Sequence, residues 1–325
     1  MIIIIVIYNI YYKYIYIMNK IYNYILYFLC GILFYYIINS IDKLEVGDDV
    51  VDPIIGGWCM CANGNKPVWD QINVNTIIAG GFQGIGSIGP FGKEINISNN
   101  LSLDDTCYGK NILKKYTHKW LSVGGAAVGC NGEKESCPEY RKSCLDNALE
   151  LINKYNFNGI AFDMEGCLSL THDVMNDINQ WITTNKTTLG PDFNYVYVGG
   201  KWPSGYDFSN FTYICPMLYT NDESYNNAVG AERKIDEYIT SWTDNDWQKD
   251  QIILTYQAIS AMGGRDNRSP DNINNGKIVL QYLTNLLIRG NYAGLLGWPP
   301  VYTDFLKQKT DADGCMTIIN EILNK

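Results

Sequence analysis

Two acidic side chains near the middle of the chain could act together as an acid–base pair. Asp163 and Glu165 stand two residues apart in Asn158–Glu165, an otherwise largely apolar segment that reads Asn-Gly-Ile-Ala-Phe-Asp-Met-Glu. Because alternate residues of a β-strand point to the same side, both carboxylates would share one face. Their repulsion and partial burial would raise the pKa of one of them and keep it protonated near neutral pH. The same spacing would also suit a purely structural pair bonded to a neighbouring strand.

The rest of the chain supplies elements that could position such a pair. From residue 53 onward, short apolar segments of strand character alternate with amphipathic segments of helical periodicity. The strands are expected at Ile54–Cys59, Val74–Phe82, Trp120–Gly125, Gly159–Glu165, Tyr195–Gly199, Phe211–Tyr219, Gln251–Tyr256 and Tyr292–Trp298. The helices are expected at Glu139–Tyr155, His172–Thr184, Ala228–Trp242, Ile273–Ile288 and Thr303–Leu323. Alternation predicts a parallel sheet, and eight repeats predict an α/β protein with a closed (β/α)8 TIM barrel. An open doubly wound sheet is the alternative.

In such a barrel the acidic pair would lie where active sites are found. Ala161, Asp163 and Glu165 would share the inner face of the fourth strand, while Ile160 and Phe162 would face the surrounding helices. The two carboxylates would stand at the carboxyl-terminal end of this strand, the end that carries the active site in this fold.

Composition and charge exclude several classes of function. Hydrophobic residues make up 46% of the chain and charged residues 18%, which suits a large folded core. The formal net charge is −9 and no Lys/Arg cluster occurs, so we expect no nucleic-acid partner. The two histidines, His118 and His172, are not spaced as a ligand pair, so we expect neither a zinc site nor a histidine-dependent triad. Gly84–Gly89 spells the dinucleotide-binding fingerprint, but Pro90 and an Asn/Ser-rich stretch follow where a helix would be needed.

The first forty residues differ from the remainder. Residues 1–39 are dominated by Ile, Tyr, Leu, Phe and Asn, and Lys20 precedes an apolar run at Ile21–Ile38 that ends before Ser40. A cleaved signal peptide and a retained signal anchor formed by residues 21–39 both fit this pattern, and low-complexity translation upstream of Met18 is compatible with either. We therefore expect a signal or anchor segment at 1–40 and one barrel domain at 41–325, secreted or extracytoplasmic.

Cysteines and glycosylation sequons agree with that route. Nine of the ten cysteines follow the apolar run, which suits several disulfides in an oxidising compartment with one thiol left over. Their pairing stays open. Asn-x-Ser/Thr sequons predict a glycoprotein and occur at Asn96, Asn100, Asn185, Asn210 and Asn267.

Several short motifs give the chain a resemblance to a known family. Asn158–Glu165 resembles the strand-four signature of the family 18 glycoside hydrolases, the chitinases and endo-β-N-acetylglucosaminidases, usually written D-G-x-D-x-D-x-E. Leu121–Gly125, with Ser122 and Gly124, is similar to the strand-three S-x-G-G of that family, and Met217-Leu-Tyr219 to its M-x-Y. The tryptophan that ends the eighth strand there looks like Trp298, and Trp58 stands where the first strand often carries an aromatic residue. The resemblance covers residues 50–323.

The resemblance implies a chemistry and roles for these residues. The expected reaction is substrate-assisted, retaining hydrolysis of β-1,4 bonds next to N-acetylglucosamine, without a metal or an organic cofactor. Glu165 would be the acid and base, Asp163 would orient the substrate's acetamido group, and Tyr219 would hydrogen-bond its carbonyl. Sugar contacts are expected from Trp298, Met217, Trp58, Ser122 and Gly124. We expect a monomer whose partner is a glycan such as chitin and whose membrane contact is limited to an uncleaved N-terminal segment.

The match departs from the family signature at two acidic positions. Asn158 replaces the first Asp and can keep a structural hydrogen bond, but Ala161 replaces the inner Asp that would contact Asp163. Asp163 would then need another partner, such as Ser122, Tyr219 or water. The sequence therefore leaves a second hypothesis open, a chitinase-like lectin that binds N-acetylglucosamine glycans with weak or no catalysis, although the acid Glu165 is retained.

Overall fold

The computed structural model describes residues 52–60, 69, 74–80, 114–124, 138–164, 170–218, 228–258, 270–298 and 305–324. The chain divides into Met1–Asp52 and a compact unit, Pro53–Lys325, and the folded architecture is that of the second. The expected signal or anchor segment lies outside the described residues, as do Gly84–Gly89, Glu165 and Tyr219. Within the described part, no helix is long and apolar enough to cross a membrane.

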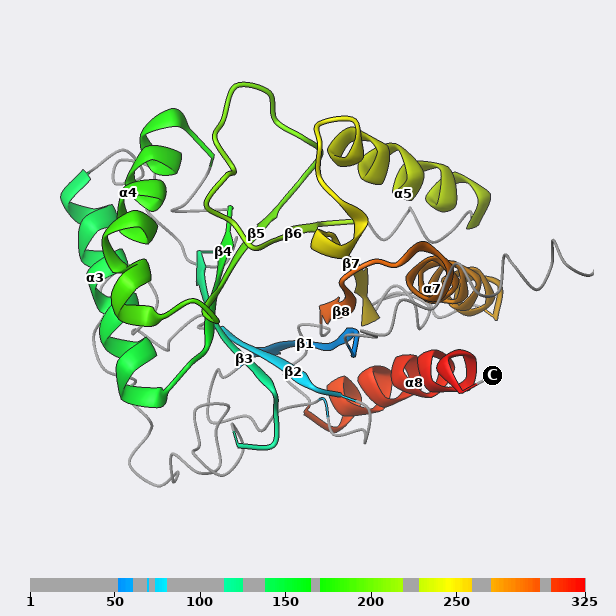
Figure 1. Cartoon of the computed structure of the whole chain (residues 1–325). Helices are drawn as coiled ribbons and strands as arrows, with labels where there is room; N and C mark the ends of the chain where they lie inside the picture. The colour runs from blue at the N-terminus through cyan, green and yellow to red at the C-terminus, as the bar shows by residue number, and fades with distance from the viewer. Residues whose placement is uncertain are drawn as a thin grey trace, which may run out of the picture. The chain divides into compact units, whose positions relative to one another are not determined.

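Eight parallel strands form the centre of this unit (Figure 1). They are β1 (Ile54–Met60), β2 (Thr76–Gly80), β3 (His118–Gly124), β4 (Gly159–Asp163), β5 (Asn194–Gly199), β6 (Tyr213–Pro216), β7 (Ile253–Gln257) and β8 (Gly294–Trp298). Their order is β6-β5-β4-β3-β2-β1-β8-β7, and among the described residues a parallel bridge of Ile214 with Ile252 joins β6 to β7 and closes the barrel. The predicted (β/α)8 barrel is confirmed.

Helices flank the strands on two sides. They are α3 (Pro138–Tyr155), α4 (His172–Leu189), α5 (Ala228–Thr243), α7 (Pro270–Gly290) and α8 (Phe305–Leu323), with a short 3-10 helix η5 (Lys249–Gln251) before β7. Figure 1 shows α3 and α4 along one side and α5, α7 and α8 along the other. Each lies where the sequence predicts a helix, with ends shifted by a few residues.

Local sequence fixes where the helices begin and end. The Thr171 hydroxyl oxygen caps α4 by accepting from Val174 N at 3.2 Å, and Gly190 ends the helix with φ 92°. Asn156 and Asn291, directly after α3 and α7, adopt φ 57° and 54°. Asn tolerates this left-handed backbone better than most residues, so a polar residue ends these two helices.

The two faces of the strands bury different sets of side chains. Ala161 on β4 belongs to the cluster inside the barrel, whereas Ile160 and Phe162 pack in the larger cluster between strands and helices. This is the alternation predicted for the fourth strand. Strand pairing carries it around the barrel, because Ala161 lies opposite Ser122 on one side and Val196 on the other.

Large side chains close the amino-terminal half of the barrel interior. Trp120 on β3 is fully buried and fills the space that a side chain at Gly159 would need, since a Cβ there would lie 2.3 Å from the Trp120 ring. Trp120 also stacks on Tyr213 of β6, with ring centroids 6.1 Å apart. Because the amino-terminal half of the interior is filled, any space for a ligand inside the barrel lies at its carboxyl-terminal end.

The connection from β5 to β6 is a loop in the structure. Residues 200–212 contain no helix, and aromatic side chains cover the strands in its place. Tyr197 packs edge-on against Phe208 at 4.8 Å, and Trp202 and Phe208 each lie against Trp242 of α5, at 5.1 and 5.3 Å between centroids. Buried aromatic area substitutes for the missing helix face.

Candidate active site

Asp163 lies at the carboxyl-terminal end of β4 and is almost completely buried, with 2% of its surface exposed. It shares one row of the sheet with Gly124 on β3 and Val198 on β5. Cys215 on β6 follows in the same row, opposite Val198, and is a free, buried thiol. Burial, and then the nearby Asp163 charge, raises the pKa of Cys215, so this thiol stays neutral.

The wall beneath Asp163 is apolar, because Ala161 is fully buried among the inner hydrophobic side chains. Ser122 is also buried, at 5% exposed, but pairing places it opposite Ala161, two rows below Asp163. The residue directly opposite Asp163 is Gly124. Its φ of 98° lies in the left-handed region that favours glycine.

Asn158 keeps the structural hydrogen bonds expected of it. Its side-chain oxygen accepts from Lys119 N and its amide donates to Thr117 O, both at 2.7 Å. These bonds join the start of β4 to the start of β3. Asn158, which stands in the first acidic position of the signature, therefore stabilises the pairing of β3 with β4 at the amino-terminal end of β4. Asp163 lies at the other end of the same strand.

Two tryptophans meet on the other side of the barrel mouth. Trp58 on β1 and Trp298 on β8 lie with ring centroids 5.2 Å apart and an interplanar angle of 51°. Trp58 has no exposed surface, whereas Trp298 is partly exposed. Trp298 is therefore the ring of this pair that a ligand could reach, and Trp58 supports it from beneath rather than presenting its own surface.

Trp69 fixes the backbone that carries this pair. Its indole N–H donates to Trp58 O at 3.0 Å, and Tyr116 OH donates to Trp69 O at 2.7 Å. Gly57 and Gly297 admit the Trp69 ring, since a Cβ at either position would lie 2.5 Å from it. The Gly-Trp pairs on β1 and β8 thus have one physical cause, a third tryptophan packed against them.

Met217 follows β6 and lies half-buried against the inner cluster. Its two neighbours are bonded to one side chain on β7, because the Thr255 hydroxyl donates to Pro216 O at 2.6 Å and accepts from Leu218 N at 2.9 Å. Thr255 is fully buried. The sequence prediction missed it, although the alternation Thr255-Tyr-Gln257 would have placed two polar side chains on the inner face.

The structure brings Asp163, Ser122, Gly124, Met217, Trp58 and Trp298 to the carboxyl-terminal half of the barrel. Glu165 and Tyr219 lie outside the described residues, one residue past Met164 and Leu218 respectively. Met164 N bonds to Val198 O at 3.0 Å, so strand-like pairing continues to the residue before Glu165. Among the described side chains, no group of three acidic, His or Cys residues could hold a metal ion.

The cysteines are in two states. Cys59, next to Trp58, is disulfide-bonded, whereas Cys215 and Cys315 are the free thiols among the described cysteines. The number and pairing of the disulfides, and the oxidising compartment expected from them, stay predictions.

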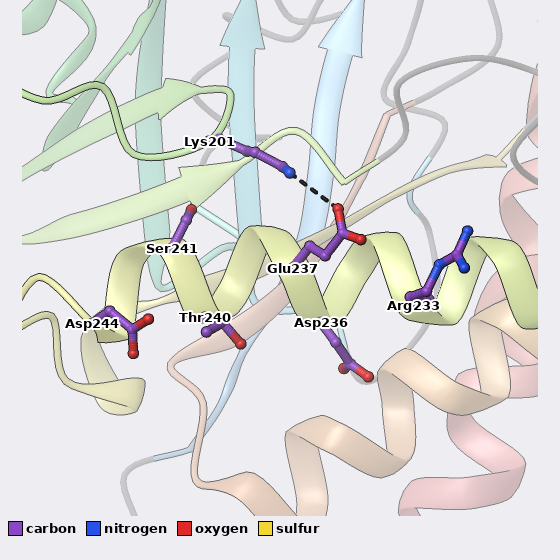
Figure 2. A pocket seen from close by; sticks show the side chains of 7 residues that line it. All are labelled: Lys201, Arg233, Asp236, Glu237, Thr240, Ser241 and Asp244. Carbon is purple, nitrogen blue, oxygen red and sulfur yellow. Dashed lines mark hydrogen bonds and ion pairs between the residues drawn. The ribbon is translucent and has the colours of Figure 1, made fainter.

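Two open hollows lie on the outside of the barrel, one along α5 and one beside the segment that follows it. The charged hollow, about 450 Å³, is lined by Lys201, Arg233, Asp236, Glu237, Thr240, Ser241 and Asp244. Figure 2 shows Lys201 reaching Glu237 across it, with 3.1 Å between nitrogen and oxygen. The second hollow, about 410 Å³, is rich in aromatic residues and includes Trp202, Tyr206 and Trp247.

Comparison with known proteins places the fold. The sequence matches no protein-family model and no curated protein. Solved structures do match. A class V chitinase from Nicotiana tobaccum superposes with a TM-score of 0.52 over 81% of this chain and 98% of its own, at 13% identity. An immunomodulatory chitinase from Trichuris suis gives 0.54 over 83% and 100%, at 13% identity.

A third similar structure is a chitinase-like agglutinin from Robinia pseudoacacia, with a TM-score of 0.51 over 80% of this chain and 98% of its own, at 15% identity. Chitinases described as family GH18 are among the similar structures as well. The chain therefore has the fold of the family 18 chitinases.

Proposed function

We propose that this protein is a secreted glycosidase that cleaves β-1,4 bonds next to N-acetylglucosamine. The observation that carries the proposal is the position of Asp163, a buried carboxylate at the carboxyl-terminal end of β4, in a mouth that also presents Trp298. A barrel whose lower interior is packed with large side chains leaves this end for a ligand. The chitinases that share the fold give the substrate class.

The mechanism we infer is substrate-assisted. Glu165 donates a proton to the glycosidic oxygen as the bond to the anomeric carbon breaks. The carbonyl oxygen of the substrate's own 2-acetamido group attacks that carbon and forms an oxazolinium ion. Glu165, now a carboxylate, takes a proton from water, which opens the ion and restores the configuration.

Each remaining side chain stabilises one part of that step. Asp163 accepts a hydrogen bond from the acetamido N–H and offsets the positive charge that develops there. Tyr219 holds the carbonyl in place for attack. Trp298 supports the apolar face of the sugar, and its ring is held at a fixed tilt by Trp58.

One observation favours a second function, a chitinase-like lectin. Ala161 leaves an apolar wall where the family signature carries a carboxylate next to Asp163, and a chitinase-like agglutinin shares the fold. A protein that binds the sugar without cleaving it would tolerate this wall.

The deciding experiment compares the secreted full-length chain with Glu165→Gln on labelled chito-oligosaccharides. The enzyme proposal predicts product from the unsubstituted protein and its loss in the variant, with sugar binding retained by both. If neither protein gives product while both bind the sugar, the lectin is the correct function. If neither binds, both proposals are wrong.

A further inference from the structure

The second hollow, called the aromatic hollow below, is lined by the loop between β5 and β6 and by the segment between α5 and β7. Its lining residues are Trp202, Tyr206, Asp207, Phe208, Ser209, Phe211, Asn245, Asp246, Trp247 and Gln251. Asp207 and Tyr206 come before β6, and Asn245, Trp247 and Gln251 come before β7. All eight strands are parallel, so the starts of β6 and β7 lie at the end of the barrel opposite to Asp163. Trp202, in contrast, follows the carboxyl end of β5, and Tyr206 stacks on His172 at the start of α4, so the hollow runs along the outside of the barrel. None of its described lining residues belongs to the cluster inside the barrel or to the candidate active site.

Three partly exposed rings line it, and each is held from behind. Tyr206 stacks on His172 with centroids 4.6 Å apart and 22° between planes. Trp202 packs at 5.0 Å against buried Phe208, and Trp247 lies edge-on to Trp242 at 6.1 Å. Rings that are fixed before binding offer flat apolar surface at little cost in conformational entropy.

The polar lining is made of carboxylates, amides and a hydroxyl. The Asp207 carboxylate accepts from Ser209 N at 2.9 Å, and the hydrogen bonds from Ser209 lower the pKa of Asp207, so it stays ionised and fixed. Among the described residues that line the hollow there is no Lys or Arg. An anionic ligand such as a phosphate or a nucleic acid would meet negative charge without a counter-charge.

Aromatic rings beside carboxylates would also suit a cation. The Asn245 NH₂ group donates to Ser241 O at 2.9 Å, so this amide offers its oxygen as an acceptor, and Gln251 is the amide that argues against a cation. The Gln251 side-chain oxygen accepts from Gln248 N, which leaves its NH₂ group as the part that can meet a ligand. An N–H donor repels a cation and pairs with a hydroxyl oxygen. The rings can stack on the C–H faces of a sugar, and the carboxylates can accept hydrogen bonds from its hydroxyl groups. The Gln251 NH₂ group can donate to a hydroxyl oxygen. Together these groups match a neutral sugar.

The charged hollow along α5 provides the contrast. No aromatic residue lines it, and its Lys201–Glu237 ion pair is about half exposed, at 48% and 53% (Figure 2). A sugar would find no ring to stack on there. It can therefore serve as the control surface.

We propose that the aromatic hollow is a second glycan-binding site, which takes a neutral sugar unit on the outside of the barrel, apart from the active site. The choice of an N-acetylglucosamine oligomer as ligand rests on the proposed function; the site itself needs no catalysis. A chain bound there would stay attached to the protein while another chain, or another part of it, occupies the mouth.

The test measures binding of chitotetraose to the full-length chain by calorimetry, with four variants. Trp298→Ala removes the sugar platform at the mouth, Trp247→Ala and Gln251→Ala each alter the aromatic hollow, and Thr240→Ala alters the charged hollow. Circular dichroism checks that each variant is folded, and Gln251→Ala covers the case in which Trp247→Ala unfolds the chain. Spermidine serves as the cationic probe.

We expect Trp298→Ala to retain one binding event, which Trp247→Ala or Gln251→Ala added to it weakens at least tenfold and Thr240→Ala leaves unchanged. Binding that survives both hollow substitutions unchanged would overturn the proposal, and so would spermidine binding that they abolish while sugar does not bind. Failure of the proposed function looks different. The protein then releases no product, yet the hollow variants still lower the sugar affinity.

Discussion

Backbone pairing holds one side of the barrel mouth, and a single side chain holds much of the other. Between β3 and β4 the ladder runs from Trp120–Gly159 to Gly124–Asp163 without interruption. Between β6 and β7 the bridge of Ile214 with Ile252 is the backbone pairing among the described residues, and Thr255 supplies the next links through its hydroxyl. The β3–β4 ladder holds the buried carboxylate of Asp163. The junction between β6 and β7, called the seam below, holds Met217.

This difference decides how much a single substitution disturbs each side of the barrel mouth. A ladder fixes many backbone atoms at once, so the loss of one side chain leaves the carboxylate in place. At the seam, one buried hydroxyl satisfies two backbone groups, so one substitution exposes both to an apolar surrounding. The ladder side suits a charged group that needs a fixed position, such as Asp163. The seam side suits a van der Waals contact, such as that of Met217.

The largest effect is expected for Asp163→Asn on the ladder side. Under the proposed function, a neutral amide cannot offset the charge that develops on the acetamido nitrogen, so kcat/KM for chitotetraose should fall by about 10²- to 10³-fold. Met217→Leu on the seam side changes shape slightly and should change kcat/KM less than tenfold. Equal losses for the two variants would show that the sides do not differ in this way.

Gly159→Ala tests how closely the ladder is packed. A Cβ at Gly159 would lie 2.3 Å from the buried Trp120 ring and 3.0 Å from Asn194 O, so the free energy of unfolding should fall by about 1–3 kcal/mol or more. Gly200→Ala is the matched control, because nothing lies within 4 Å of its added Cβ, and its effect should stay within about 0.5 kcal/mol. Urea unfolding of both variants gives the comparison.

Thr255→Val breaks the seam without changing side-chain volume. Pro216 O and Leu218 N lose a buried partner, and the free energy of unfolding should fall by about 1–3 kcal/mol. Thr255→Ser should recover most of it. Thr284→Val is the control: this buried hydroxyl donates to Leu280 O within α7, so its loss should cost less than about 1 kcal/mol. Similar losses at 255 and 284 would remove the seam's special role.

Asn158→Ala tests the side-chain bonds that join β3 to β4. Water can reach this half-buried amide, and the backbone ladder persists, so a loss of about 1 kcal/mol is expected, smaller than at Thr255. Asn158→Asp keeps the acceptor for Lys119 N and loses the donor to Thr117 O. Its free energy of unfolding should therefore lie between those of the unsubstituted protein and Asn158→Ala. A loss for Asn158→Ala greater than that of Thr255→Val would contradict the comparison.

The smallest effect is expected from His118 at the start of β3. Burial lowers its pKa from the ordinary value of 6.5, so the unfolded chain binds this proton more strongly than the folded chain. The His118 contribution to stability is therefore complete above about pH 6.5 and is lost as the pH falls through the depressed folded pKa. His118→Gln should reduce the loss of stability in that window, measured by unfolding at pH 5 and pH 7.5.

The sequence by itself determined the repeating order of strands and helices, and with it the barrel. Its apolar alternation also determined that Ala161 and Asp163 face inward while Ile160 and Phe162 face the helices. These properties follow from local periodicity, which is written in neighbouring residues. The helix ends at Asn156 and Gly190 have the same local origin.

Tertiary structure alone decided which residues meet across strands. That Trp58 lies buried under Trp298, that Cys215 shares the row of Asp163, and that Thr255 bonds both neighbours of Met217 depend on pairing between segments distant in sequence. Register and ring packing are fixed by the simultaneous burial of many side chains, so no single stretch of sequence contains them. The aromatic hollow is of the same kind, because its rings come from the loop before β6 and the loop before β7.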